Sequence, residues 1–295
     1  MKYLKQLVAQ LKKQKKLHEH EIFNYAIPSL WDHVDVDGSY TYHNEKIVNP
    51  YDFYYENILA LLKNKEEKDY LRSYSRIHNL KSTQGNWIKE SFVYSAMIRT
   101  SAAYDHDHDG YITQSNLYEL KETGTFLKFI VLIPLLKEMG INTLYLLPFF
   151  KTSPHNKKGE FASCYAVSDF FKLDEDLKDP MVDMDVEDQC RAFIEACHMH
   201  DIRIVIDIIP RTNAIRSTLL KDHPDWFYWI DKDYKWQYNP PYIDNIAPCS
   251  FPSEENMKKV YESRACKRYL SHFRIDPKTL DEKKYKQLIQ KCKLL

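Results

Sequence analysis

The chain has 295 residues, and its 42 basic and 42 acidic side chains cancel to a formal net charge of zero. A balanced charge gives no overall field to attract nucleic acid or an anionic membrane, which argues against both kinds of partner. The sequence also lacks a run of about 18 apolar residues that could cross a membrane, and its lysine-rich start has no apolar core of signal-peptide length. We therefore expect a soluble, cytoplasmic protein.

The six cysteines show no CxxC pair and no other zinc-binding spacing. Most of them fall in the apolar rows of ordinary segments, so we expect free, buried thiols in a reducing compartment. Cys190 and Cys197 would lie about 10 Å apart on a helix, which is too far for a disulfide.

Residues 1–85 are expected to form a separate helical and hairpin region. A stripe of leucine and valine opposite lysines predicts an amino-terminal helix that docks on its own domain rather than on a membrane surface. The stretch HVDVDGSYTYHN alternates like a β-hairpin turning at Asp37-Gly38, and a helical run, YDFYYENILALLKN, follows it.

Residues 86–295 begin with a strand and helix alternation. Two amphipathic helices are predicted: one opens at Gly124-Thr125 and is kinked by Pro134, and the other, near 185–200, is capped by Asp185. Three apolar segments are predicted as strands, the last two fully buried: 91–99, 142–148 and 202–209. Short parallel strands joined by helices indicate an α/β fold, either doubly wound or a (β/α) barrel. From about residue 210 the sequence becomes loop-rich.

Asp207 is the only charged residue within the apolar run of the third strand, near its carboxyl end. In a (β/α) barrel this end carries the active site, because the strand holds the side chain rigidly at the barrel mouth. The alternative is a buried aspartate that pairs with an arginine or caps a loop.

The stretch DHDHDG, residues 105–110, places carboxylates on alternate residues before a glycine that permits a tight turn. Oxygen donors in this pattern suit Ca²⁺, or less readily Mg²⁺. The candidate ligands are Asp105, Asp107, Asp109, the carbonyl of Tyr111 and Thr113. The alternative is an acidic turn that only water solvates.

The loop is not an EF-hand, because the segment before it is predicted as a strand and position twelve is Asn116 instead of glutamate. A protein-interaction module that depends on Ca²⁺ is therefore disfavoured. His106 and His108 alternate away from the candidate ligands, and we expect an exposed pair rather than a transition-metal site.

Several motifs together resemble the start of the catalytic barrel in the alpha-amylase superfamily of retaining α-glucan hydrolases and glucanotransferases. They are VYSAMIR before the D-x-D-x-D-G loop, then GTF, GINTLYLLP, SCYAVSDFFKLDEDL and RIVIDIIPRT, and they span about residues 87–229. The sequence around HPDWFYWI is most similar to a bacterial branch of this superfamily, near its trehalose-synthase and maltosyl-transferring members.

The resemblance implies roles for individual residues. Asp105, Asp107, Asp109 and Tyr111 match a calcium loop after the first barrel strand. Tyr165 matches the residue that stacks on the sugar ring beside the scissile bond, and Asp207 matches the aspartate that supports the active-site arginine. Arg211-Thr212 stands where Asn-His is usual, so Arg211 is a candidate substrate contact in an altered subsite.

In this superfamily the catalytic carboxylates follow barrel strands four and five, which the sequence does not supply. We therefore expect an incomplete (β/α)₈ TIM-type barrel of about three strands, the truncated and inactive front part of an enzyme acting on α-glucosidic bonds. The alternatives are a non-catalytic protein that binds Ca²⁺ or a maltooligosaccharide, and half of a two-chain barrel.

Overall fold

The computed structural model describes residues 1–63, 65–79, 86–155, 157, 159, 161–210, 212–237, 239–243 and 253–292. Its contacts divide the chain into two compact units, Met1–Ile215 and Arg216–Leu295. The boundary expected near residue 85 falls inside the first unit. Segments on both sides of it contribute to one hydrophobic core there, and the division of the sequence at residue 85 stays a prediction.

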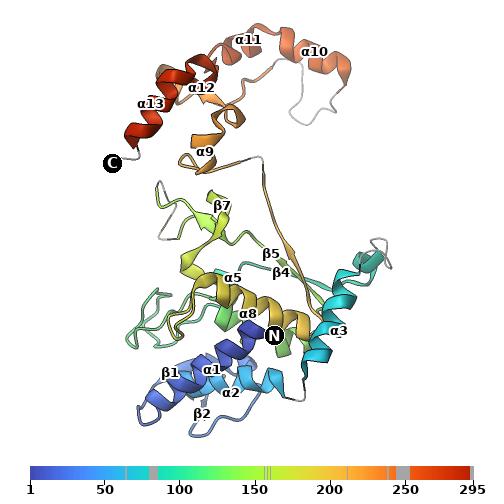
Figure 1. Cartoon of the computed structure of the whole chain (residues 1–295), viewed down its shortest axis with the longest axis vertical. Coiled ribbons are helices and arrows are strands. Elements are labelled where there is room, and N and C mark those ends of the chain that lie inside the picture. The colour runs from blue at the N-terminus through green and yellow to red at the C-terminus, as the bar shows by residue number, and fades with distance from the viewer. Residues whose placement is uncertain are drawn as a thin grey trace. The chain divides into compact units, whose positions relative to one another are not determined.

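The first part of unit 1 is the predicted helical and hairpin region. Its amino-terminal helix, α1, buries Leu4, Leu7 and Leu11 and packs against α2 and α8, as Figure 1 shows. The predicted docking of this helix on its own domain is therefore confirmed. The elements of this region are α1 (Lys2–Leu17), β1 (Tyr25–Pro28), η1 (Ser29–Trp31), β2 (Tyr40–Tyr42), β3 (Glu45–Val48), α2 (Pro50–Leu62), α3 (Glu67–His78) and η2 (Asn86–Glu90).

The hairpin of this region turns at a different place from the one predicted. Strands β2 and β3 pair antiparallel and connect through His43 and Asn44, and His43 adopts a left-handed φ of 53°. Gly38 also has a positive φ, of 75°, but it lies before β2. A turn does form at Asp37-Gly38, where the Ser39 N–H donates to the Val36 carbonyl, but the prediction that the hairpin turns there was wrong. The hairpin turns at His43, because histidine can also adopt the left-handed conformation that a tight turn needs.

The second part of unit 1 contains a parallel sheet with the order β4-β5-β8. Helices cross over between the strands. Pro134 is the second residue of α7, directly after α6 ends, so the predicted kink is confirmed as a break. Asp185 caps α8 through its side chain, also as predicted. The elements are β4 (Val93–Ala96), α5 (Ile98–Ser101), α6 (Phe126–Val131), α7 (Ile133–Glu138), β5 (Thr143–Leu146), β6 (Phe150–Thr152), β7 (Val167–Leu173), η3 (Glu175–Leu177), α8 (Val186–Met199) and β8 (Arg203–Ile206).

Gly124 allows the close approach of two helices in this sheet-and-helix layer. A Cβ atom at this position would lie 1.9 Å from the carbonyl oxygen of Ile98 in α5. The backbone N–H of Gly124 donates to the carbonyl of Arg99 at 2.8 Å. Glycine is therefore required where the chain enters α6, and this close contact explains the glycine of the GTF motif.

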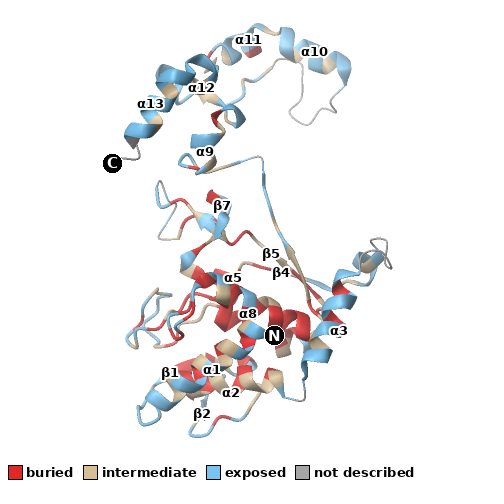
Figure 2. Cartoon of the chain, in the orientation of Figure 1, coloured by how far each residue is buried: buried red, intermediate tan, exposed pale blue. Residues whose placement is uncertain are grey.

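The core lies between the sheet and the helices that cover one of its faces, and Figure 2 shows it as buried residues along α8 and the inner side of α1. Strand β5 is the central strand, and Leu144 and Leu146 are fully buried in it. Strand β8 was expected to be fully buried, and this expectation was wrong. Ile206 is 39% exposed and Ile208, just beyond the strand, is 54% exposed, because β8 pairs only with β5 in the described part of the chain.

Unit 2 is formed by short helices and one small antiparallel pair, β9 with β10. Its helices are mostly exposed in Figure 2, and Cys266 is one of its few buried apolar residues. The elements are α9 (Leu219–Asp222), η4 (Pro224–Trp226), β9 (Trp229–Ile230), η5 (Lys232–Tyr234), α10 (Glu254–Glu262), α11 (Arg264–Leu270), β10 (Phe273–Arg274), α12 (Pro277–Leu280) and α13 (Glu282–Cys292).

The cysteines that the structure describes are free and buried, as predicted: Cys164, Cys190, Cys197 and Cys266. Cys249 and the side chain of Cys292 lie outside the described residues. None of the described helices is both long enough and apolar enough to span a membrane.

Candidate functional site

Two residues that the sequence singled out, Tyr165 and Asp207, meet at the carboxyl end of β8. The backbone N–H of Asp207 donates to the carbonyl of Leu146 at 2.8 Å, which extends the pairing of β8 with β5 by one residue. The Tyr165 hydroxyl, on the loop before β7, donates to Asp207 Oδ2 at 2.8 Å. This hydrogen bond raises the pKa of Tyr165 to about 12, since the nearby carboxylate opposes ionisation of the phenol. The ring of Tyr165 stays accessible, with 37% of the residue exposed.

Tyr145 is a third member of this group that the sequence analysis missed. It lies on β5 opposite Val205, and because side chains alternate along strands, it shares a face of the sheet with Asp207. Hydrogen bonding to Asp207 raises the pKa of Tyr145. The segment NTLYLLP offered one signal, since Tyr145 is its only aromatic residue.

The loop that carries Tyr165 is fixed by a buried ion pair. Arg99 in α5 donates to Asp174 Oδ2 at 2.7 Å and to the carbonyl of Ala162 at 3.2 Å. Burial raises the pKa of Asp174, and the Arg99 guanidinium acts against that rise. Because Ala162 is three residues before Tyr165, Arg99 restrains the loop segment that carries Tyr165 as well as the side chain of Asp174.

The third predicted substrate contact, Arg211, lies outside the described residues. Its neighbour Thr212 is exposed. The role of Arg211 in an altered subsite therefore stays a prediction.

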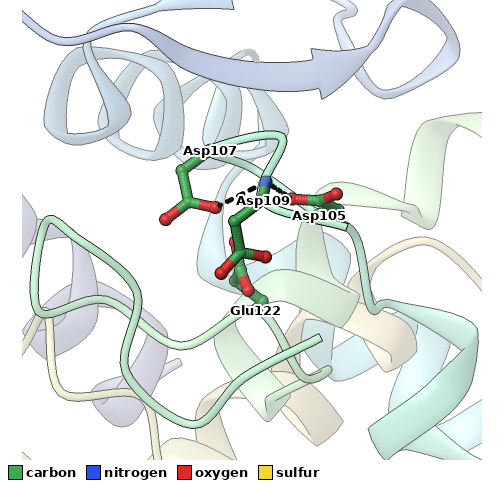
Figure 3. A group of neighbouring side chains, drawn as sticks. All are labelled: Asp105, Asp107, Asp109 and Glu122. Carbon is green, nitrogen blue, oxygen red and sulfur yellow. Dashed lines mark hydrogen bonds between the residues drawn. The ribbon is translucent and has the colours of Figure 1, made fainter. Parts of the chain in front are cut away.

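The carboxylates of the DHDHDG loop gather as predicted, and Figure 3 shows Asp105, Asp107 and Asp109 together with Glu122. One oxygen from each of these four residues lies within 4.8 Å of the others. Gly110 takes a φ of 87° at the turn. Its backbone N–H donates to Asp105 Oδ2 at 2.9 Å, and the N–H of Asp109 donates to Asp105 and Asp107, so the loop is wrapped around the carboxylates.

Glu122 was missed because it comes 13 residues after Asp109 and follows no motif. It is fully buried and accepts hydrogen bonds from the backbone of His106 at 2.9 Å and of Thr113 at 3.0 Å. The Thr113 hydroxyl, a candidate ligand, donates to Glu122 Oε2 at 3.0 Å. Tyr111 is 72% exposed, and its carbonyl stays a predicted ligand.

The expectation of an exposed histidine pair was wrong for His106, although His108 is exposed. The His106 ring is fully buried and stacks on Tyr25, with 4.1 Å between ring centroids. Its Nδ1 donates to the carbonyl of Ala26 at 2.7 Å, and its Nε2 accepts from the buried Lys128 ammonium at 3.0 Å. Burial and then the Lys128 charge hold the pKa of His106 well below its usual range, and burial lowers the pKa of Lys128 to about 8.

The donor set of the cluster fits a hard divalent cation. It consists of carboxylate oxygens without nitrogen or sulfur ligands, and such oxygens are what Ca²⁺ and Mg²⁺ prefer. Further oxygens from backbone carbonyls or water would complete the six to eight ligands that are typical of Ca²⁺.

A family model for the alpha amylase catalytic domain matches residues 105–286, more than half of the chain. The matched segment begins at Asp105 and includes Tyr165 and Asp207. The chain therefore belongs to the alpha-amylase family.

Curated relatives match about half of this chain. A trehalose synthase of Thermus thermophilus is 24% identical over 165 residues, which cover 51% of this chain and 13% of the relative. An alpha-1,4-glucan:maltose-1-phosphate maltosyltransferase of Chlorobaculum tepidum is 26% identical over 144 residues, covering 45% of this chain and 21% of the relative. The chain thus matches only a small part of the length of these relatives.

Solved structures of amylases are also similar to this chain over about half of its length. The crystal structure of an alpha-amylase from Lactobacillus plantarum shares 22% sequence identity at a TM-score of 0.36, covering 49% of this chain and 28% of that one. A maltogenic alpha-amylase from Thermotoga neapolitana shares 25% identity at a TM-score of 0.36, covering 49% and 29%.

Proposed function

We propose that this chain belongs to an enzyme that hydrolyses or transfers at α-glucosidic bonds with retention, and that it supplies one sugar-binding wall of the active site. The observation that carries the proposal is the hydrogen bond between Tyr165 and Asp207 at the carboxyl end of the sheet. The carboxylate fixes the phenol, so its exposed ring is held ready to stack on a sugar. Tyr145 supports Asp207 from the neighbouring strand.

We also propose that the 295-residue chain forms only the first three strands of a (β/α)₈ barrel and does not turn over α-glucans alone. Retaining hydrolysis needs two carboxyl groups about 5 Å apart, a nucleophile and a general acid and base. The family resemblance implies that these groups follow the fourth and fifth barrel strands. Within residues 212–237, 239–243 and 253–292, no strand pairs with β8.

Exposed apolar side chains on the sheet support this proposal. Val93 on β4 is 51% exposed and Ile208 after β8 is 54% exposed, so both edges of the parallel sheet carry uncovered apolar groups. Neighbouring strands cover such edges in a closed barrel. The missing strands would come from further sequence of the same protein or from a second chain, which are alternative forms of the proposal.

Titration calorimetry with maltoheptaose, together with a reducing-sugar assay, tests both statements. We expect the intact chain to bind maltoheptaose without releasing reducing sugar, and Tyr165→Ala to weaken binding by about tenfold, equivalent to the loss of one stacking contact. Tyr228→Ala is the matched control, because Tyr228 is an exposed tyrosine in unit 2. Turnover by the intact chain that disappears in a Tyr165→Ala and Asp207→Asn double variant would overturn the proposal of inactivity.

The alternative function is glucan binding without catalysis, and the same group of Tyr145, Tyr165 and Asp207 favours it. The two candidates differ in what a completing partner does. Adding a chain that carries strands four to eight restores turnover only if this chain is part of an enzyme. A cytoplasmic location stays a prediction for either candidate.

We propose further that Asp105, Asp107, Asp109 and Glu122 bind Ca²⁺, or with lower affinity Mg²⁺, and that the ion stiffens the loop after β4. The all-oxygen cluster supports this assignment. In calorimetric titrations with CaCl₂, we expect binding to the intact chain and its loss in Asp107→Asn. Asp183→Asn, which alters an exposed carboxylate outside the cluster, should bind as the intact chain does. Equal heats from all three proteins would refute the site.

A further inference from the structure

The ion loop presents different side chains on its two sides. Asp105, Asp107 and Asp109 gather with Glu122 (Figure 3), whereas the rings of His106 and His108 contact Ala26 and Glu45 of the amino-terminal region. The carboxylates and the histidines of the DHDHDG stretch therefore make two separate sets of contacts. One set is the carboxylate cluster, and the other set faces the amino-terminal region of unit 1.

His106 is the centre of the second set. Its Nδ1 donates to the carbonyl of Ala26 in β1, and its own carbonyl accepts from the Ala26 N–H at 2.9 Å. The ring packs flat on Tyr25 with an interplanar angle of 13°, and Trp31 meets it edge-on. His106 lies between the candidate ligands Asp105 and Asp107. Two reciprocal hydrogen bonds and a ring stack therefore join it to β1.

Tyrosines on either side of His106 make further links to the same region. The Tyr104 hydroxyl donates to Glu45 at the start of β3, and His108 Nε2 lies 2.9 Å from the other oxygen of Glu45. The Tyr118 hydroxyl accepts from the backbone N–H of Asn24 at 3.0 Å. These contacts come from residues 24–45, which precede the segment that the family model matches.

The buried side chains of Glu122 and Lys128 also hold the loop in place. The backbone N–H of His106 donates to Glu122 Oε1, and the Lys128 ammonium donates to His106 Nε2 and to the carbonyl of Lys121. His106 is thus bonded to β1 on one side, to a member of the carboxylate cluster through its backbone, and to α6 through Lys128. Any movement of β1 away from the loop would displace the backbone that carries Asp105 and Asp107.

We propose that the amino-terminal region preorganises the ion loop, with His106 as a positioning residue, so that cation binding and docking of β1 stabilise each other. The inference rests on the proposed Ca²⁺ site. A loop already held in its binding geometry loses less conformational entropy when the ion binds. Thermodynamic linkage requires the reverse effect of equal size, in which Ca²⁺ tightens the docking of β1.

Two measurements on the full 295-residue chain test the coupling. Hydrogen exchange follows the Ala26 amide, which donates to His106, and we expect CaCl₂ to slow its exchange about fivefold or more. The Ile202 amide, bonded to the Cys197 carbonyl within the α8–β8 connection, is the internal reference and should not change. In Asp107→Asn, CaCl₂ should leave Ala26 exchange unchanged.

Calorimetry with CaCl₂ provides the second measurement. The double variant Tyr104→Phe and Tyr118→Phe removes two links to the amino-terminal region without changing any charge, and we expect its Ca²⁺ affinity to fall about fivefold. Tyr40→Phe, on β2 in the same region, is the matched control and should bind as the intact chain does. Circular dichroism checks that each variant is folded.

The outcomes separate the coupling from the ion site itself. Ca²⁺ binding to the intact chain with unchanged Ala26 exchange, and with equal affinity in the double variant, overturns the coupling and leaves the ion site standing. No Ca²⁺ binding to the intact chain overturns both. Slower Ala26 exchange with Ca²⁺, found in the intact chain and absent from Asp107→Asn, supports the coupling.

Discussion

The Tyr165 hydroxyl donates to Asp207 Oδ2 at 2.8 Å, and this contact joins a loop residue to a strand end 42 positions later in the sequence. The carboxylate both holds the ring and raises the pKa of the phenol to about 12. The orientation and the pKa of the proposed stacking residue therefore depend on the same hydrogen bond.

Asp207→Asn should lower the pKa of Tyr165 from about 12 toward the ordinary tyrosine value of about 10, because the negative charge that opposes phenolate formation is removed. The change is measured by NMR titration of the Tyr165 ring between about pH 9 and about pH 12, which covers the usual range of tyrosine pKa values. Asp183→Asn is the control and should leave the titration unaltered. An unchanged midpoint in Asp207→Asn would show that the pair does not form in solution.

Two isoleucines on either side of β8 test whether the sheet edge is open. Ile202→Ala removes a fully buried side chain and should lower the free energy of unfolding by about 2–5 kcal/mol. Ile208→Ala removes a side chain that is largely exposed and should cost less than about 1 kcal/mol. Urea denaturation of both variants gives the comparison. Similar losses at the two positions would mean that something covers the carboxyl end of β8 in solution.

Glu195 on α8 caps the amino terminus of α1, although the two segments are far apart in the sequence. Its carboxylate accepts from the backbone N–H groups of Lys2 at 3.0 Å and Leu4 at 2.8 Å, which have no partner within their own helix. Glu195→Ala should therefore lower the free energy of unfolding by about 1–2 kcal/mol, as the loss of a helix cap does. Thermal unfolding beside the exposed-site control Glu187→Ala measures the effect, and equal melting temperatures would contradict it.

His198 should make unit 1 less stable as the pH falls. Burial, with help from His78 and Arg203, lowers the pKa of His198 from 6.5 to about 4. The unfolded chain then binds more protons than the folded chain between these values, so the stabilisation is complete above pH 6.5 and is lost as the pH falls toward 4.

Denaturation at pH 7 and pH 5 measures this dependence. Between about pH 7 and about pH 5, we expect His198 to contribute a fall of about 1–2 kcal/mol in the free energy of unfolding, after allowance for solvent screening. His106 and His200, whose pKa values burial also lowers, add to the total fall. His198→Gln should flatten the profile, whereas the exposed control His20→Gln should leave it unchanged. A profile that is equally steep in both variants would assign the effect to other groups.

The sequence by itself determined the local elements and the members of each site that belong to a motif. Helical spacing, the Pro134 break and the Asp185 cap depend on neighbours within a few residues, and the structure confirms each of them. Asp105, Asp107 and Asp109 were recognisable for the same reason, because the chain brings alternate residues of one short loop together without help from the rest of the fold.

The tertiary structure decided which residues from distant parts of the sequence join the two sites, and which strands are covered by other elements. Glu122 reaches the carboxylate cluster, and Tyr145 reaches Asp207, across gaps that no local pattern encodes. The burial of His106 and the exposure of Ile208 likewise follow from β1 covering one surface and no described strand pairing with β8. Burial depends on what packs against a side chain, whereas the sequence records directly only what precedes and follows it.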